Sequence, residues 1–146
     1  MRDPQRRRGQ TGQAVVELAL VAPFLLFLAF GVVAIGRVAQ AEMAVSAVAE
    51  EAARTAALAP TAGAAVVAGI ERGQQVATGY GLAASGLQLT VDARAFGRGG
   101  QIRATVRYTV GVQDLPLLGW AQLPVRSTHV APIDRYASLG PVGSTP

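Results

Sequence analysis

A run of uncharged residues near the N-terminus constrains this chain more than any other feature. From Leu18 to Gly36 there are 19 residues and no charged side chain. As a helix this run is about 28 Å long, close to the hydrocarbon thickness of a bilayer. The rest of the chain is too short to enclose a buried helix of that length. The run therefore predicts a membrane span over residues 18–36.

The charges around the run predict its direction. Four arginines and one aspartate give the first 12 residues a net charge of +3, whereas Arg37 and then Glu42, Glu50 and Glu51 follow the run. Because positive residues stay on the cytoplasmic side, we expect a cytoplasmic N-terminus and an exported C-terminal part. The leader thus holds most of the formal charge of +4, and the remainder lacks the charge and interleaved aromatics of a nucleic-acid-binding surface.

Two other interpretations of the run remain open. A secretory signal peptide also has a basic start and an apolar stretch, and residues 39–41, Ala-Gln-Ala, offer a small-residue cleavage site. The apolar stretch of such a signal usually has only about 7–15 residues. A plain single-pass anchor fits the length of the run, but it leaves Glu17 at its N-terminal boundary unexplained.

Glu17 is explained if the chain is cut between Gly12 and Gln13. Glu17 then becomes the fifth residue of the mature protein, directly before the apolar run. The cut creates an α-amino group on Gln13, which in a packed assembly can lie against Glu17 of a neighbouring subunit. An unpaired acid costs about 2.5–3.5 kcal/mol at mid-membrane and less near the edge, so the pairing is favourable and sets the axial register of subunits. A glutamate at the membrane surface needs no such partner.

Nearly the whole chain resembles the TadE-like minor pilins (pseudopilins) of tight-adherence, or Flp/type IVb, pilus systems, and the specific motifs lie in its N-terminal third. These proteins have a basic leader, a G-Q-A-x-V-E-x-A-L core, an early proline, a G-R pair and an alanine-rich A-A-R-x-A-A helix. The matching positions are residues 12–20, Pro23, Gly36-Arg37 and residues 52–57, with a late H-V-x-P-x-D-R-Y segment at residues 129–136. The major Flp pilins carry Glu-Tyr where this chain has Glu17-Leu18, so the resemblance favours a minor subunit.

The resemblance implies a structural role in pilus assembly. It implies cleavage after Gly12 by a prepilin peptidase, residence in the bacterial cytoplasmic membrane and incorporation in, or priming of, a surface pilus or related secretion apparatus. The expected partners are other pilin or pseudopilin subunits, inner-membrane pilus assembly proteins and the membrane, with no nucleic acid and no small-molecule substrate. The alternative is a membrane-anchored or secreted extracytoplasmic binding module without a pilus role.

The span is predicted to continue outward as one helix over residues 13–58, because residues 38–58 are rich in helix formers and contain no glycine or proline. Pro23 removes one backbone hydrogen bond inside the span, and Gly31 and Gly36 permit close helix contact. A stripe of small apolar residues, Val38, Ala41, Val45, Val48 and Ala52, follows at helical spacing. It can pack against the chain's own globular part or against neighbouring helices.

The region 59–146 is predicted to form a small extracytoplasmic α+β domain. Thr61 can cap a second helix over residues 62–78, with Val66, Val67, Ile70 and Ala77 as its apolar side. Alternating residues at 87–95 and 102–112 flank a glycine-rich turn and predict an antiparallel hairpin. If Arg98-Gly99 is the tip of the turn, Asp92 lies diagonal to Arg103 and Arg107 on the open face.

A third strand is expected at residues 123–130, which gives a fold class of α+β: a long N-terminal helix packed on an antiparallel sheet of about three strands, as in pilins. Trp120, the only tryptophan, lies in an apolar loop between strands. It either plugs the end of the small core or contacts a partner subunit or the membrane surface. Residues 137–146 are predicted to be a flexible tail.

No catalytic constellation is apparent. Cysteine is absent, the single histidine is His129, and the few carboxylates are scattered over segments with different roles. The glycine-rich FGRGGQ stretch is a turn, and no phosphate-binding motif is present. We therefore expect no enzymatic activity, no metal site and no cofactor.

Overall fold

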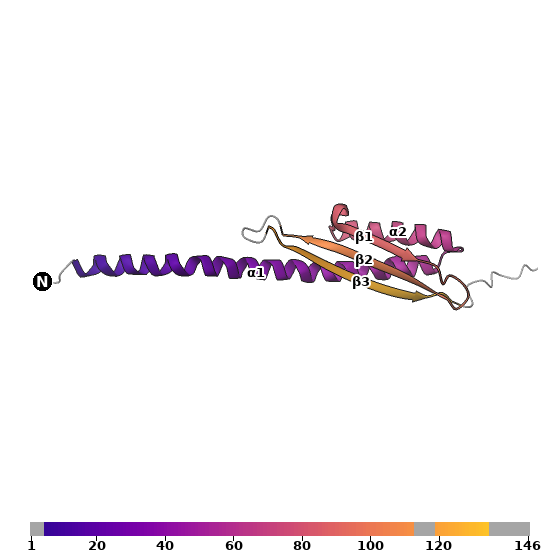
Figure 1. Ribbon diagram of the computed structural model, residues 1–146, viewed down its shortest axis with the longest axis horizontal. Coiled ribbons are helices and arrows are strands. Elements are labelled where there is room, and N and C mark those ends of the chain that lie inside the picture. Colours follow the sequence, from indigo (N-terminus) through magenta and orange to yellow (C-terminus); the bar gives the residue numbers. More distant parts are fainter. Residues whose placement is uncertain (1–4, 113–118, 135–146) are drawn as a thin grey trace, which may run out of the picture. The chain divides into compact units, whose positions relative to one another are not determined.

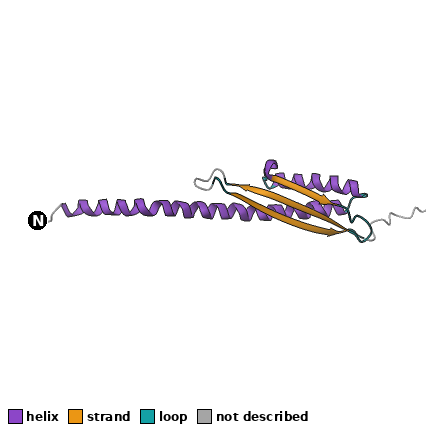
Figure 2. Cartoon of the chain, viewed as in Figure 1, coloured by secondary structure: helices purple, strands orange, loops and turns teal. Residues whose placement is uncertain are grey.

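The computed structural model describes the backbone of residues 5–112 and 119–134, with side chains from residue 12 onward. Its elements are α1 (Gln5–Ala57), α2 (Ala62–Gly79), a short 3-10 turn (Ala84–Gly86), β1 (Leu87–Asp92), β2 (Gln101–Gly111) and β3 (Gln122–Pro132). Figures 1 and 2 show these helices and strands. The expected α+β fold, with a long helix and a three-stranded sheet, is confirmed. The predicted tail at 137–146 lies outside the described residues.

The described residues fall into two units. The apolar unit contains residues up to Gly36 together with Val112 and residues 119–121, and the sheet unit contains residues 37–111 and 122–134. Each is described by itself. Helix α1 contributes its first part to the apolar unit and its last part to the sheet unit.

The apolar unit consists mainly of the first part of α1, which stays helical through Pro23. Its large apolar side chains are exposed, including Leu18, Phe24 and Ile35 at 64%, 77% and 71%. Among the described residues, the part of α1 from Gly12 is the one helix long and apolar enough to cross a membrane. Such a helix is typical of a membrane anchor or a signal sequence.

In the sheet unit, the last part of α1 provides one wall of the core. Its buried residues are alanines and valines at three- and four-residue intervals: Ala41, Ala44, Val45, Val48, Ala49, Ala52, Ala53 and Ala56. The helix ends at Ala57, and Pro60 lies three residues farther on. The predicted stripe therefore packs against the chain's own domain, which decides between the two interpretations left open by the sequence.

Helix α2 begins as predicted. Thr61 caps it, since its hydroxyl accepts a hydrogen bond from the backbone N–H of Ala64 at 3.2 Å. The predicted apolar side is partly wrong, however, because Val67 is 57% exposed. The buried residues are small and recur every fourth position: Ala65, Gly69, Gly73 and Ala77.

The small residues let α2 lie very close to α1 and β1. A Cβ placed on Gly69 would lie 3.0 Å from the Ala52 carbonyl oxygen and 3.1 Å from Val91 Cγ2. A Cβ on Gly73 would meet the side chains of Leu89 and Ala52. In Figure 1, α2 accordingly lies beside the last part of α1 and along β1. Glycine is needed at both positions because the backbones approach so closely.

The three strands form an antiparallel sheet in the order β1-β2-β3. One face of β2 is covered, with Ile102, Ala104 and Val106 fully buried, as the alternation predicts. The predicted pairing of β1 with β2 is wrong by two residues. Asp92 lies directly opposite Arg103 rather than diagonal to Arg103 and Arg107. The connection from Ala93 to Gly100 is an eight-residue loop rather than a tight turn at Arg98-Gly99, although Gly99 does adopt φ +73°.

Candidate processing site and assembly surfaces

The peptide bond between Gly12 and Gln13 lies inside a continuous helix. Helix α1 begins at Gln5, seven residues before Gly12, and Gly12, Gln13 and Glu17 are all exposed. A Cβ added to Gly12 would meet nothing within 4 Å. Packing within the described structure therefore does not require a glycine at position 12.

Glu17 is an acidic residue on an otherwise apolar helical surface. Its neighbours Val16, Leu18 and Leu20 are at least 60% exposed. Residues four apart lie on one face of a helix, so Glu17 and Gln13 share a face. Within the part of the chain whose side chains are described, no hydrogen bond or ion pair engages Glu17.

The remaining predicted span residues belong to the same helix. Pro23 does not interrupt it, and a Cβ on Gly31 or Gly36 would meet nothing within 4 Å. Both glycines therefore leave the helix surface open to close approach by another helix.

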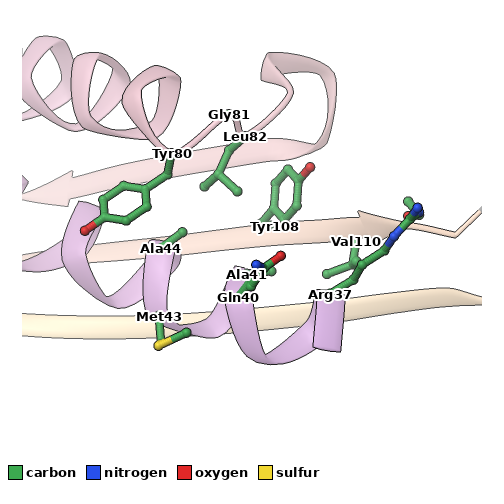
Figure 3. A pocket seen from close by; sticks show the side chains of 11 residues that line it. Arg37, Gln40, Ala41, Met43, Ala44, Tyr80, Gly81, Leu82, Tyr108 and Val110 are labelled. Atoms are coloured by element: carbon green, nitrogen blue, oxygen red, sulfur yellow. The ribbon is translucent and has the colours of Figure 1, made fainter. Parts of the chain in front are cut away.

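The sheet unit contains a hollow of about 590 Å³ that the sequence did not predict. Figure 3 shows side chains from α1, from the segment after α2 and from β2 around it. Its wall combines apolar groups such as Met43 and Leu82 with the rings of Tyr80 and Tyr108. At one end, the Arg37 guanidinium donates a hydrogen bond to the Gly111 carbonyl at 3.3 Å. The lining contains one cation and no carboxylate, so it does not form an acid–base pair.

The charges on the open face of the sheet are arranged differently from the prediction. Asp92 pairs with Arg94, whose guanidinium donates to Oδ1 from Nε at 3.0 Å and to Oδ2 from Nη2 at 2.6 Å. The hydrogen bonds from the side chain and backbone of Arg94 lower the pKa of Asp92 to about 2. The side-chain hydrogen bond to Asp92 and the negative charge of Asp92 raise the pKa of Arg94. The predicted cross-strand pairing of Asp92 is thus replaced by a local one, which the two-residue spacing of Asp92 and Arg94 could have indicated.

Two other predicted features concern single side chains. His129 is exposed on β3, opposite Ala104, and no three His, Asp or Glu residues of the described chain are grouped so as to hold a metal ion. Trp120 is 83% exposed, so its interpretation as a plug of the core is wrong. Its contact with a partner subunit or the membrane stays a prediction.

Comparison with known proteins places the N-terminal part of the chain in a family. Residues 12–54 match the family model of the TadE-like protein. The match begins at Gly12 and covers the apolar helix and most of the buried alanine stripe that follows it. No curated protein and no solved structure matches the chain. Residues 12–54 of this protein are therefore a TadE-like domain.

Proposed function

We propose that this protein is a prepilin-like minor subunit of a tight-adherence-type pilus or a related secretion apparatus. The observation that carries the proposal is the TadE-like domain, whose match starts at Gly12, the residue that precedes the proposed cut. The family implies association with a pilus system. An extended apolar helix followed by a small sheet domain supports a role in assembly rather than in catalysis.

In this proposal the chain has three parts. Residues 1–12 are a cytoplasmic leader, residues 13–58 are the helix that crosses the membrane at 18–36, and residues 59–146 are the extracytoplasmic domain. The exposed apolar side chains of α1 before Arg37 support a span there. The four leader arginines support a cytoplasmic N-terminus, because positive residues stay inside.

Removal of the leader requires α1 to open at the scissile bond. A peptidase must reach the Gly12–Gln13 bond, which lies within the helix. Glycine weakens a helix by about 1 kcal/mol relative to alanine. Gly12 therefore makes this opening easier, besides presenting no side chain near the bond.

The cut would supply the partner that Glu17 lacks. The new α-amino group of Gln13 is positive and lies at the same end of the helix as the Glu17 carboxylate. Pairing between neighbouring subunits would let the positive amine and the negative carboxylate offset each other in apolar surroundings, where either charge alone is costly. The pairing would also fix the axial position of one subunit against the next.

The alternative function, an anchored or secreted binding module, is favoured by the hollow beside Arg37 and Tyr80. Secretion by a cut after Ala41 would remove Arg37, Gln40 and Ala41 from its lining. Ala41 is also buried in the core at 5% exposure. An anchored module that keeps its leader is therefore the form of this alternative that leaves the hollow intact.

The test is leader processing in cells that contain a prepilin peptidase. Gly12→Val should block processing, so the chain should retain Met1 when its N-terminal peptide is identified by mass spectrometry. Gly31→Val is the matched control, since both glycines lie in α1 with open space at Cβ. Processing of Gly12→Val to the same extent as the control would refute cleavage at this bond. Glu17→Ala should leave membrane insertion intact and impair pilus assembly.

A further inference from the structure

The sheet unit carries opposite charges on its two faces. The face of the sheet that points away from the helices exposes three arginines, Arg103, Arg107 and Arg126. On that face Asp92 is bonded to Arg94, so the three guanidiniums define its charge. The other face is formed by the helices. Residues 38–79, which include these helices, hold four carboxylates and two arginines, a net charge of −2.

Two of the arginines, Arg107 and Arg126, occupy an arrangement that the domain alone does not favour, whereas Arg103 lies directly opposite Asp92. Arg107 and Arg126 lie directly opposite each other in the β2–β3 register. Like charges in this relation repel and destabilise a sheet slightly. In the described residues no salt bridge joins Arg103, Arg107 or Arg126 to a carboxylate. The neighbouring row is neutral, with Thr105 and Thr128 hydroxyls 3.3 Å apart. A face of this kind gains from contact with an acidic surface.

The outer side of α1 offers two carboxylates to such a face, and the exposed Arg54 follows Glu50 by four residues on the same side. Glu42 and Glu50 are exposed and lie on the side of α1 that the core leaves uncovered, with Ser46 between them. Eight residues of helix separate the two glutamates by about 12 Å along the axis. Four residues of strand separate Arg103 from Arg107 by about 13 Å. The two charge spacings therefore match.

The directions of the two elements match as well. The Gly111 end of β2 is bonded to Arg37, and Ile102 near its other end belongs to the same core cluster as Ala52 and Ala56. Figure 1 shows β2 running along this part of α1. The line from Glu42 to Glu50 thus runs the same way as the line from Arg107 to Arg103. A second copy in the same orientation can place its glutamates opposite these arginines.

We propose that copies of this chain stack with the arginine face of one sheet against the Glu42–Glu50 side of α1 in the next copy. The contact joins two different surfaces, so it does not close on itself as a twofold dimer does and can extend from copy to copy. The contact requires neighbouring copies of α1 to be parallel, as they are when all copies are anchored in one membrane. In this respect the inference rests on the proposed function. The copy at each end of such a stack keeps one of these two faces free for a further subunit.

Cysteine cross-linking tests the stacking in the full chain, which contains no native cysteine. Ser46→Cys and Thr128→Cys each label one of the two faces. In membranes holding both variants, a short bismaleimide should link Ser46→Cys chains to Thr128→Cys chains and should link neither variant to itself. Self-linking as the main product would overturn the proposal, because it indicates a twofold contact between like faces.

Charge reversal tests the contact itself. Arg107→Glu should lower the mixed cross-link about fivefold, since it replaces attraction by repulsion at an exposed pair. Arg98→Glu, an equal charge change in the β1–β2 loop, should leave the yield unchanged. Arg107→Glu chains should recover cross-linking to copies that carry Glu42→Arg, because the parallel arrangement places Glu42 opposite Arg107. Equal yields for Arg107→Glu and Arg98→Glu, or capture of a different acidic protein in place of a second copy, would overturn the proposal. Leader processing, measured on the same samples, is independent of this outcome and reports on the proposed function alone.

Discussion

Gly69 is the position at which the packing of the sheet unit can be tested most sharply. Replacing it with alanine places a Cβ 3.0 Å from the Ala52 carbonyl oxygen and 3.1 Å from both Ala56 Cβ and Val91 Cγ2. Two of these three atoms belong to α1, and one of the two is backbone, so the clash cannot be relieved by turning a side chain. Helix α2 must move away from α1 and β1 instead.

The magnitude follows from two opposing effects. Alanine is favoured over glycine within a helix by about 1 kcal/mol. Overpacking of a tight core costs about 1–3 kcal/mol. Gly69→Ala should therefore change the free energy of unfolding by between nothing and a loss of about 2 kcal/mol. The control is Gly63→Ala in the same helix, where the new Cβ meets nothing within 4 Å, and the expected change is a gain of up to about 1 kcal/mol.

Native-state hydrogen exchange of the β2 amides in detergent micelles measures the difference. Each 1.4 kcal/mol lost corresponds to roughly tenfold faster exchange through opening of the domain. We expect Gly69→Ala to exchange faster than Gly63→Ala by about five- to a hundredfold. If both variants slow exchange equally, the close approach of α2 to α1 is wrong.

Three further changes are predicted. Ile102→Ala removes a fully buried side chain of the core and should cost about 2–5 kcal/mol, measured by the same exchange experiment; a loss below about 1 kcal/mol would contradict the assigned core. Thr61→Ala removes the cap of α2 and should cost about 1 kcal/mol, seen as faster exchange of the Ala64 amide. Arg94→Gln should raise the pKa of Asp92 from about 2 toward its ordinary 3.8, measured by carboxyl NMR. Because the folded-state pKa of Asp92 is depressed, the stabilisation from its ionised form is complete above about pH 4 and is lost as the pH falls through 2. If Asp92 titrates identically in Arg94→Gln, Arg94 is not the cause of the low pKa.

Local patterns in the sequence were sufficient for most of the fold. Strict alternation at Ile102, Ala104 and Val106 identified the covered face of β2, and Thr61 after Pro60 identified the start of α2. The wrong face of α2 has a physical reason. Helical spacing of large residues such as Val67 predicts the apolar side, whereas the close contact with α1 selects the smallest residues, Gly69 and Gly73.

The register of the hairpin and the hollow depend on three-dimensional arrangement. The length of the β1–β2 loop decides which residues pair, and the loop is held by contacts such as the hydrogen bond from the Gln101 N–H to the Ala95 carbonyl. The hollow joins Arg37, Tyr80 and Tyr108 from three separate elements, so no local pattern marks it. The proposed processing site is the opposite case, because Gly12, Gln13 and Glu17 lie within six consecutive residues of the sequence.

The mature N-terminus of the native chain tests the central proposal most directly. The chain would be purified from the membranes of cells that are assembling filaments, and its N-terminal peptide would be identified by mass spectrometry. We predict that the peptide begins at Gln13, which places a free α-amino group four residues before Glu17. A peptide that begins at Met1 would contradict the account, because Glu17 would then have no terminal amine to pair with.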